Sequence, residues 1–209
     1  ADTAFGGEGA PLVPLAEKWL FTDYRSFLNI GGIANLSIHR ASGEILGYDV
    51  CGANQVLNWI SKRYFNSEYD ESGRRASIGK PIPELLKKLD QIEFYKKEPP
   101  RSLGREDVES DIFPLLMNYT DGYDLLHTFN THMSKQISAA FNTHDPQGAI
   151  LLSGGGVHNE FLLQLLNQEG LKFDRADPLI INFKEALCFA LLGLFRMNAI
   201  PNCLSSVTG

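Results

Sequence analysis

Residues 26–50 read SFLNIGGIANLSIHRASGEILGYDV, and this stretch decides the fold. An apolar strand enters a turn at Gly31 and Gly32, and a second strand leaves that turn over residues 33–39. The chain then returns as a third strand, which we expect to end on Asp49. The stretch therefore predicts a glycine hairpin followed by an antiparallel strand that carries an acid.

The turn between the first two strands has two interpretations. Glycine has no Cβ, so the backbone at Gly31 and Gly32 can approach an anion closely, as in a phosphate loop. Gly-Gly is also a common two-residue turn of an ordinary β-hairpin. The glycines lie in an NxGGxAN pattern, in which Asn35 could fix the loop, and this pattern favours phosphate binding.

A second glycine loop lies about a hundred residues further on, where residues 151–159 read LLSGGGVHN. The wholly apolar residues 149–153 predict a strand buried on both faces, and a helix follows the glycines. A glycine turn before a helix N-terminus can bind an anion or a nucleotide through its amides and the helix dipole. We therefore predict nucleotide contacts at Gly154, Gly155, Gly156 and Asn159. The alternative is a strand–helix turn that needs positive φ, which rarely takes three glycines. The spacing fits neither GxGxxG nor GxxxxGK[ST].

The order of elements predicts an α/β layer architecture with a mixed sheet, because strands come first and helices then alternate with single strands. Half of an actin-like or sugar-kinase-like ATPase begins in this way. Apolar periodicity predicts helices over residues 54–65, 83–89, 123–141 and 184–198, and one after the second glycine loop. Further strands are expected near residues 171–173 and 179–181, and the glycine- and proline-rich residues 1–20 are interpreted as a loop.

Composition excludes several classes of partner. The formal net charge of −6 argues against a nucleic-acid surface. No apolar run approaches ~18–20 residues, so no membrane span is indicated, and we predict no membrane partner. Three widely spaced cysteines without a CxxC pair predict a cytoplasmic protein without a disulfide framework. The histidine spacing predicts no protein-bound metal.

Three acidic residues and one arginine are candidates for chemistry. Asp49 could act as a general base or help to hold a metal-bound phosphate. A helix cap is the alternative for Asp49, although Asn54 is better placed to cap the following helix. Arg105 and Glu106 lie in a PRSLGRE segment, where arginine suits an anionic substrate or an exposed salt bridge equally. Glu185 is expected to open the final helix, where the helix dipole favours an acid regardless of function.

Seven stretches resemble, in order, those of the anhydro-N-acetylmuramic acid kinases, and in particular the Bacteroidetes-type form. They are GGEGAPLVP (6–14), LNIGGIANLS (28–37), GYDVCGAN (47–54), PPRSLGRE (99–106), LLSGGGVHN (151–159), KEALCFALLG (184–193) and NCLSSVTG (202–209). The resemblance implies a ribonuclease H-like lobe of the hexokinase–actin–Hsp70 superfamily, with ATP bound in a cleft between two lobes. It implies a cell-wall recycling kinase that opens the 1,6-anhydro ring with water while it phosphorylates O6. The product is N-acetylmuramate 6-phosphate.

The resemblance also implies residue roles. Asp49 matches the catalytic base for the attacking water, and Glu185 matches an active-site glutamate of the last helix. The turn with Gly31, Gly32 and Asn35 matches a phosphate loop, and Gly154–Gly156 with Asn159 matches the adenosine side. Asn54, Arg105 and Glu106 are expected on the substrate side. The cofactors are ATP and Mg²⁺, with the ion carried by ATP.

The sequence departs from the family pattern in two places. The family's TGPGN after the catalytic acid is VCGAN here, so the glycine-proline geometry of that loop is not expected to carry over. No counterpart of the first phosphate loop is present, which predicts a fragment: residues 1–25 connect from an N-terminal lobe, and residues 26–209 form the C-terminal lobe. We expect this chain alone to be inactive, and a homodimer is a further expectation. The alternatives are another sugar or acyl kinase of the superfamily, or a non-catalytic nucleotide-binding or interaction module.

Overall fold

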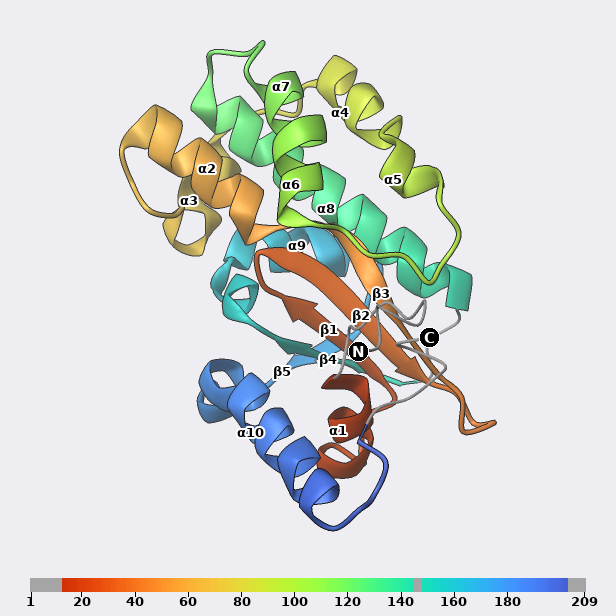
Figure 1. Cartoon of the computed structure of the whole chain (residues 1–209). Coiled ribbons are helices and arrows are strands. Elements are labelled where there is room, and N and C mark those ends of the chain that lie inside the picture. Colours follow the sequence, from red (N-terminus) through yellow and green to blue (C-terminus); the bar gives the residue numbers. More distant parts are fainter. Residues whose placement is uncertain (1–12, 145–147, 203–209) are drawn as a thin grey trace.

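The computed structural model describes residues 13–144 and 148–202, and its centre is one five-stranded sheet (Figure 1). The strands are β1 (Ser26–Ile30), β2 (Ile33–His39), β3 (Ile45–Gly52), β4 (Ile150–Ser153) and β5 (Phe173–Arg175), in the order β3-β2-β1-β4-β5. The first three strands pair antiparallel, whereas β4 and β5 join β1 in parallel. This mixed sheet, flanked by helices, is the predicted ribonuclease H-like arrangement, and the predicted glycine hairpin is confirmed.

One face of the sheet carries most of the helices (Figure 1). They are α2 (Asn54–Phe65), α3 (Arg74–Ile78), α4 (Pro83–Asp90), α5 (Glu93–Lys96), α6 (Arg105–Asp107), α7 (Phe113–Leu116), α8 (Gly122–His144) and α9 (Glu160–Gln168). Short 3-10 turns span Glu71–Gly73 and Gly155–His158, and a π-helical turn spans Val108–Ile112. The long helix α8 buries Leu125, Phe129 and Met133 completely in the main core, as its predicted apolar face requires. This core holds the strands and both glycine loops in place.

The other face of the sheet carries α1 (Val13–Leu20) and α10 (Pro178–Met197), which pack against each other (Figure 1). The loop predicted over residues 1–20 is therefore wrong for residues 13–20, and residues 1–12 lie outside the described part. The helix forms because α1 can bury Leu15 and Ala16 against Cys188 and Leu192 of α10. Helix α10 is distant in the sequence, so the local pattern of residues 13–20 does not predict this contact.

Helix α10 also corrects two predictions. Residues 179–181 are helical, not a strand, because the Asp177 carboxylate caps the helix by accepting a bond from the Leu179 amide, at 2.8 Å, and Pro178 takes the first helical position. Glu185 consequently lies about two turns inside the helix and does not open it. The helix cap at Asp177 thus outweighed the strand propensity of the β-branched residues in this stretch.

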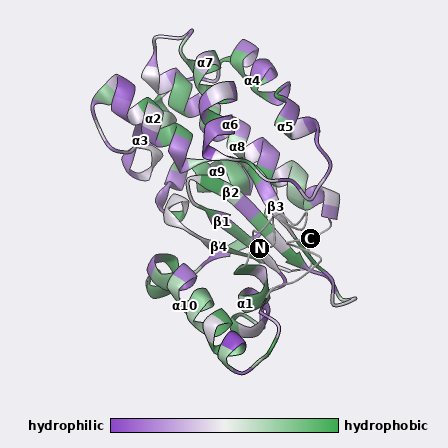
Figure 2. Cartoon of the chain, in the orientation of Figure 1, coloured by the Kyte–Doolittle hydropathy of each residue, from purple (hydrophilic) through white to green (hydrophobic). Residues whose placement is uncertain are grey.

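Helix α10 is apolar on its outer side as well (Figure 2). By length and composition alone it could cross a membrane, whereas the sequence pattern indicated no membrane span. Phe183 and Met197 are exposed, whereas Lys184 is buried against the sheet. The helix therefore has one face packed on the domain and one face uncovered among the described residues.

Candidate functional site

The glycine hairpin is bound tightly to the start of α2. The Gly32 carbonyl accepts hydrogen bonds from the amides of Ala53 at 2.8 Å and Gln55 at 3.1 Å, and the Gly31 carbonyl accepts from Asn54 at 3.0 Å. These bonds satisfy the amides that usually need a capping side chain at a helix start. They also point the carbonyls of the turn toward the helix.

The predicted capping role of Asn54 is therefore wrong. Ala53 occupies the N-cap position of α2 without a side-chain cap, because the hairpin carbonyls already satisfy the first turn. The Asn54 side chain instead donates to the Ile30 carbonyl at 3.2 Å. This bond ties the end of β1 to α2 and leaves the amide oxygen of Asn54 facing a pocket.

The second glycine loop packs directly on the first. Gly154 has φ +82°, and a Cβ at this position would lie 2.7 Å from the Ile30 carbonyl oxygen. A Cβ on Gly156 would overlap the Ile30 side chain, whereas a Cβ on Gly155 would meet only Asn54, at 3.7 Å. Two of the three glycines thus have a packing reason, and Gly155 is the one with room beside it for a ligand.

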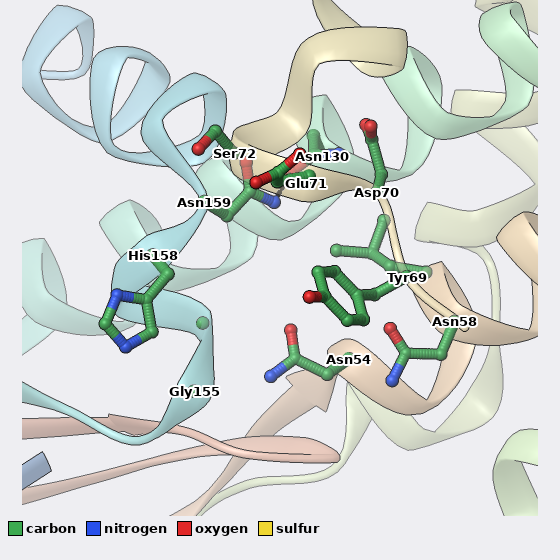
Figure 3. Close-up of a pocket in the computed structure, with 12 residues that line it drawn as sticks. Asn54, Asn58, Tyr69, Asp70, Glu71, Ser72, Asn130, Gly155, His158 and Asn159 are labelled. Atoms are coloured by element: carbon green, nitrogen blue, oxygen red, sulfur yellow. Dashed lines mark hydrogen bonds between the residues drawn. The ribbon is translucent and has the colours of Figure 1, made fainter. Parts of the chain in front are cut away.

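A first pocket of about 510 Å³ opens between this loop and α2 (Figure 3). It brings together four predicted site residues, namely Asn54, Gly155, Gly156 and Asn159. Its size lies within the range of small-ligand sites. Figure 3 shows the Tyr69 ring pointing into the space between Asn54 and the His158 side of the loop. The pocket therefore offers an aromatic face, amide side chains and a glycine backbone to one ligand.

Asn159 has a structural role in addition to its place in the pocket. Its Oδ1 accepts from the Leu162 amide at 3.1 Å and so caps α9, and its Nδ2 donates to Asn130 Oδ1 at 2.8 Å. Asn130 is almost fully buried and donates in turn to the Leu126 carbonyl. The cap, the pocket wall and α8 are thereby joined in one chain of bonds.

The far wall of the first pocket was not predicted from the sequence beyond being a turn. Residues 69–72 line it, and the Asp70 carboxylate accepts from the amides of Arg75 and Ala76, both at 2.9 Å. Gly73, at φ +70°, brings this turn into contact with Asn159, where a Cβ would overlap. The turn chemistry of YDESG was a signal for the loop, but only its contact with Asn159 makes it part of a site.

A second pocket of about 460 Å³ lies on the α10 side of the glycine loops. It brings together the predicted residues Gly31, Asn35, Gly154 and Glu185. Glu185 is exposed on its wall. The two pockets meet at the second glycine loop, since Gly154 lines one and Gly155 lines the other.

A buried ion pair forms the floor of the second pocket and was not predicted from the sequence. Lys184 Nζ lies 2.5 Å from Glu17 Oε1 and 3.0 Å from Ser153 Oγ, and Ser37 donates to the other oxygen of Glu17. The side chains of Lys184 and Glu17 are only 6% and 5% exposed. A lysine and a glutamate within the apolar stretches LAEKWL and INFKEAL were the available signal.

Asp49 lies within β3, three residues before the strand ends, rather than at its end as predicted. It pairs with Asn35 of β2, which lines the second pocket, and the extra residue Val50 forms a bulge next to this pair. Bulges of this kind re-aim neighbouring side chains. Asp49 itself lines neither of the two pockets.

The carboxylate of Asp49 is held by the PRSLGRE segment. Oδ2 accepts from the Leu103 amide at 2.9 Å and from Ser102 Oγ at 3.4 Å. Burial raises the pKa of Asp49, and these two hydrogen bonds oppose the rise. The acid is therefore half-buried and fixed through one oxygen.

Arg105 and Glu106 are exposed in α6 and line neither pocket. The Arg105 side chain pairs with Glu109 at 2.8 Å, and its carbonyl accepts from Gln55 Nε2 at 3.2 Å. The exposed salt bridge weighed from the sequence is thus present. A substrate role for these two residues stays a prediction.

The fold is a mixed α/β lobe in which two glycine loops pack against each other, and a carboxylate on β3 is held by hydrogen bonds. The family model "Anhydro-N-acetylmuramic acid kinase" matches residues 1–209. The chain belongs to this family.

Curated relatives agree with the family match. Anhydro-N-acetylmuramic acid kinases of Salinibacter ruber, Francisella tularensis subsp. novicida and Clostridioides difficile are 35%, 33% and 34% identical to the chain. Each alignment covers 100% of this chain but only 57%, 59% and 59% of the relative. The chain thus spans somewhat more than half the length of the relatives that it matches.

Two solved structures have a partly similar backbone structure. The activator of the 2-hydroxyisocaproyl-CoA dehydratase from Clostridium difficile, with bound ADPNP, gives a TM-score of 0.49 at 16% identity and covers 93% of this chain and 69% of its own. Component A of the (R)-2-hydroxyglutaryl-CoA dehydratase from Acidaminococcus fermentans gives 0.48 at 16%, with 86% and 65% covered.

Proposed function

We propose that this chain is the C-terminal lobe of an ATP-dependent anhydro-N-acetylmuramic acid kinase. The proposal is supported by the family match over the whole chain and by the 57–59% of each relative's length that it spans. Residues 1–25 would connect from an N-terminal lobe, and residues 26–209 would form the lobe itself. The complete protein would make N-acetylmuramate 6-phosphate in the cytoplasm, as a step of cell-wall recycling.

The held carboxylate of Asp49 is the observation that carries this proposal. Both hydrogen bonds reach Oδ2, and no described residue donates to Oδ1. A water molecule could therefore give its proton to Oδ1 without competition from a protein donor. The raised pKa strengthens the carboxylate as a base, which is the direction that general base catalysis near neutral pH needs.

In the proposed reaction, water opens the anhydro ring and O6 takes the γ-phosphoryl group. The water oxygen bonds to the anomeric carbon of the sugar and loses one proton to Asp49, while the bond between the anomeric carbon and O6 breaks. The electron pair released on O6 bonds to the γ-phosphorus, and ADP departs with the pair of the broken phosphoanhydride bond. The proton on Asp49 then passes to solvent. Positioning and electrostatic stabilisation account for most of the rate in phosphoryl transfers of this type.

The two pockets suggest how the substrates would be divided. We assign the nucleoside of ATP to the first pocket, where Gly155 leaves room and Tyr69 offers a ring face. The hairpin with Gly31, Gly32 and Asn35 would contact the β- and γ-phosphates. The Gly32 amide has no hydrogen-bond partner among the residues that the structure describes. Glu185 would then lie on the sugar and γ-phosphate side, in the second pocket.

Mg²⁺ fits this arrangement as an ion carried by ATP. Within residues 13–144 and 148–202, no three His, Cys, Asp or Glu side chains gather into a metal site. We propose that the chain contacts the ion through the phosphates that it neutralises. When bound, Mg²⁺ supplies positive charge to the phosphoryl group in transit.

The test is ADP release by the complete protein with ATP, Mg²⁺ and the anhydrosugar. We expect Asp49→Asn to lower kcat by more than ~100-fold. Asp111→Asn serves as a matched control, since Asp111 is exposed and, among the described residues, accepts only from Ser110 next to it. Near-normal, anhydrosugar-dependent ADP release by Asp49→Asn would exclude Asp49 as the base.

The same assay separates the alternatives. Another sugar or acyl kinase would release ADP with a different acceptor, and a binding module would bind ATP without turnover. We expect the isolated 209-residue chain to show no turnover, because the family's first phosphate loop has no counterpart in it. Sugar-dependent turnover by this chain alone would contradict that expectation.

A further inference from the structure

A segment between α5 and α6, here called the strap (residues 99–104), runs along β3 at the edge of the sheet. The Asp49 amide donates to the Arg101 carbonyl at 3.0 Å, so the strap bonds to the strand where the acid lies. An edge strand otherwise presents unpaired backbone groups. The strap therefore covers the edge and delivers Ser102 and Leu103 to the Asp49 carboxylate.

Arg101 holds the strap in this position through main-chain carbonyls. Its Nε donates to the Asp49 carbonyl at 3.3 Å, and its Nη2 donates to Val50 at 3.5 Å. Its Nη1 reaches the carbonyls of Phe94, Tyr95 and Lys97 at 3.3, 3.2 and 3.1 Å. The planar guanidinium thus joins β3 to the end of α5, a geometry that its fork of donors permits and an ammonium does not.

Aromatic rings surround the same guanidinium. Its central carbon lies 4.6 Å from the Phe94 ring centre and 5.8 Å from that of Tyr48. No carboxylate lies within ion-pair distance of Arg101 among the described residues. The positive charge of Arg101 therefore interacts with aromatic rings and main-chain carbonyls and not with an acid.

We propose that Arg101 is a positioning residue for Asp49, which it serves by fixing the strap that holds the carboxylate. The inference rests on the proposed role of Asp49 as the base. It differs from the sequence interpretation, in which an arginine of this segment binds an anionic substrate, because the Arg101 guanidinium already contacts five main-chain carbonyls of the protein.

The direction in which the pKa of Asp49 changes shows whether Arg101 acts by fixing the strap or by its positive charge. Burial is the main cause of its raised pKa, so displacing the strap exposes the carboxyl and lowers the pKa toward the ordinary value of 3.8. Losing only the positive charge of Arg101 would instead raise it. The neighbouring thiol of Cys51 stays neutral throughout, because burial raises its pKa to about 12.

The experiment follows the Asp49 carboxyl carbon by NMR during a pH titration of the 209-residue chain. We expect Arg101→Met to lower the pKa of Asp49, and Arg101→Lys, which keeps the charge but not the fork, to lower it less. Ser102→Ala should raise the pKa, because it removes one donor and leaves the burial. The control is Arg63→Met, which removes an arginine stacked on Trp59 at 5.4 Å, on α2.

The complete protein supplies the second readout. Arg101→Met should lower kcat by about 100-fold, the scale of a misplaced catalytic group, while both KM values stay within about twofold. An unchanged or raised pKa of Asp49 in folded Arg101→Met overturns the inference. If that variant does not fold, Arg101→Lys decides by the same two measurements.

The outcomes also separate this inference from the proposed function. A lowered pKa of Asp49 in a protein that never phosphorylates the anhydrosugar supports the positioning role and refutes the proposed kinase. Kinase activity that survives Arg101→Met, with a normal Asp49 titration, refutes the positioning role and leaves the kinase standing.

Discussion

Breaking the buried ion pair between Lys184 and Glu17 should be among the most destabilising single changes in the chain. Lys184→Met leaves the Glu17 carboxylate 5% exposed with Ser37 as its remaining partner, and it removes the donor to Ser153. Removing one partner of a buried pair typically costs about 3–5 kcal/mol, because the other charge stays in a poorly solvating site. For a chain of 209 residues this corresponds to a fall in Tm of about 6–20 °C.

The measurement is urea unfolding of the chain, followed by circular dichroism. Lys62→Met is the matched control. It also breaks a lysine–glutamate pair, with Glu68 at 3.1 Å, but the two side chains are 68% and 79% exposed, so a loss below about 1 kcal/mol is expected. The double variant Glu17→Met with Lys184→Met should recover most of the loss, since no unpaired charge remains. A loss below about 1 kcal/mol for Lys184→Met alone would refute the reasoning.

Three further predictions concern the site. Gly156→Ala should unfold the chain at lower urea than Gly155→Ala, because only the former places a Cβ against Ile30; equal midpoints would contradict the packing account. Asn159→Ala should cost about 1–2 kcal/mol through the lost α9 cap, measured by the same unfolding, and an unchanged midpoint would count against that role. Asp49→Asn should be more stable than the wild type at pH 7. The folded Asp49 carboxyl has the raised pKa and binds its proton more tightly than in the unfolded chain, so wild-type stability falls as the pH rises from about 3.8 through the folded pKa. The advantage of the variant should vanish below that window in Tm measurements between pH 3 and 7, and a wild type that is the more stable at pH 7 would contradict it.

Local chemistry accounts for the elements that were predicted correctly. The helix over residues 54–65 matches α2, and the apolar face over residues 123–141 lies within α8. Their apolar residues recur about every 3.6 positions, and this period can be recognised within a short stretch of sequence. The strand at residues 179–181 failed because a cap at Asp177, one position before the helix, outweighed the propensity of the following residues.

The candidate site was only partly predictable. The glycines and Asn159 stood out because their residue types are unusual in a regular element. The part played by the PRSLGRE segment did not, because Leu103 reaches Asp49 through a backbone amide, and any residue except proline supplies one. The cap assigned to Asn54 failed for a similar reason, since carbonyls of a distant turn took over that task.

The sequence by itself determined the glycine hairpin and the strand–turn–helix of the second loop, because each depends on residues that are close together. It also determined the family, because seven short stretches follow one another in the family's order. Only the tertiary structure decided which glycines are required by packing and that Lys184 pairs with Glu17, which is 167 positions away. It likewise decided that residues 102 and 103 hold an acid more than 50 positions earlier. Such contacts leave no period in the sequence, since they arise only when separate elements are packed against one sheet.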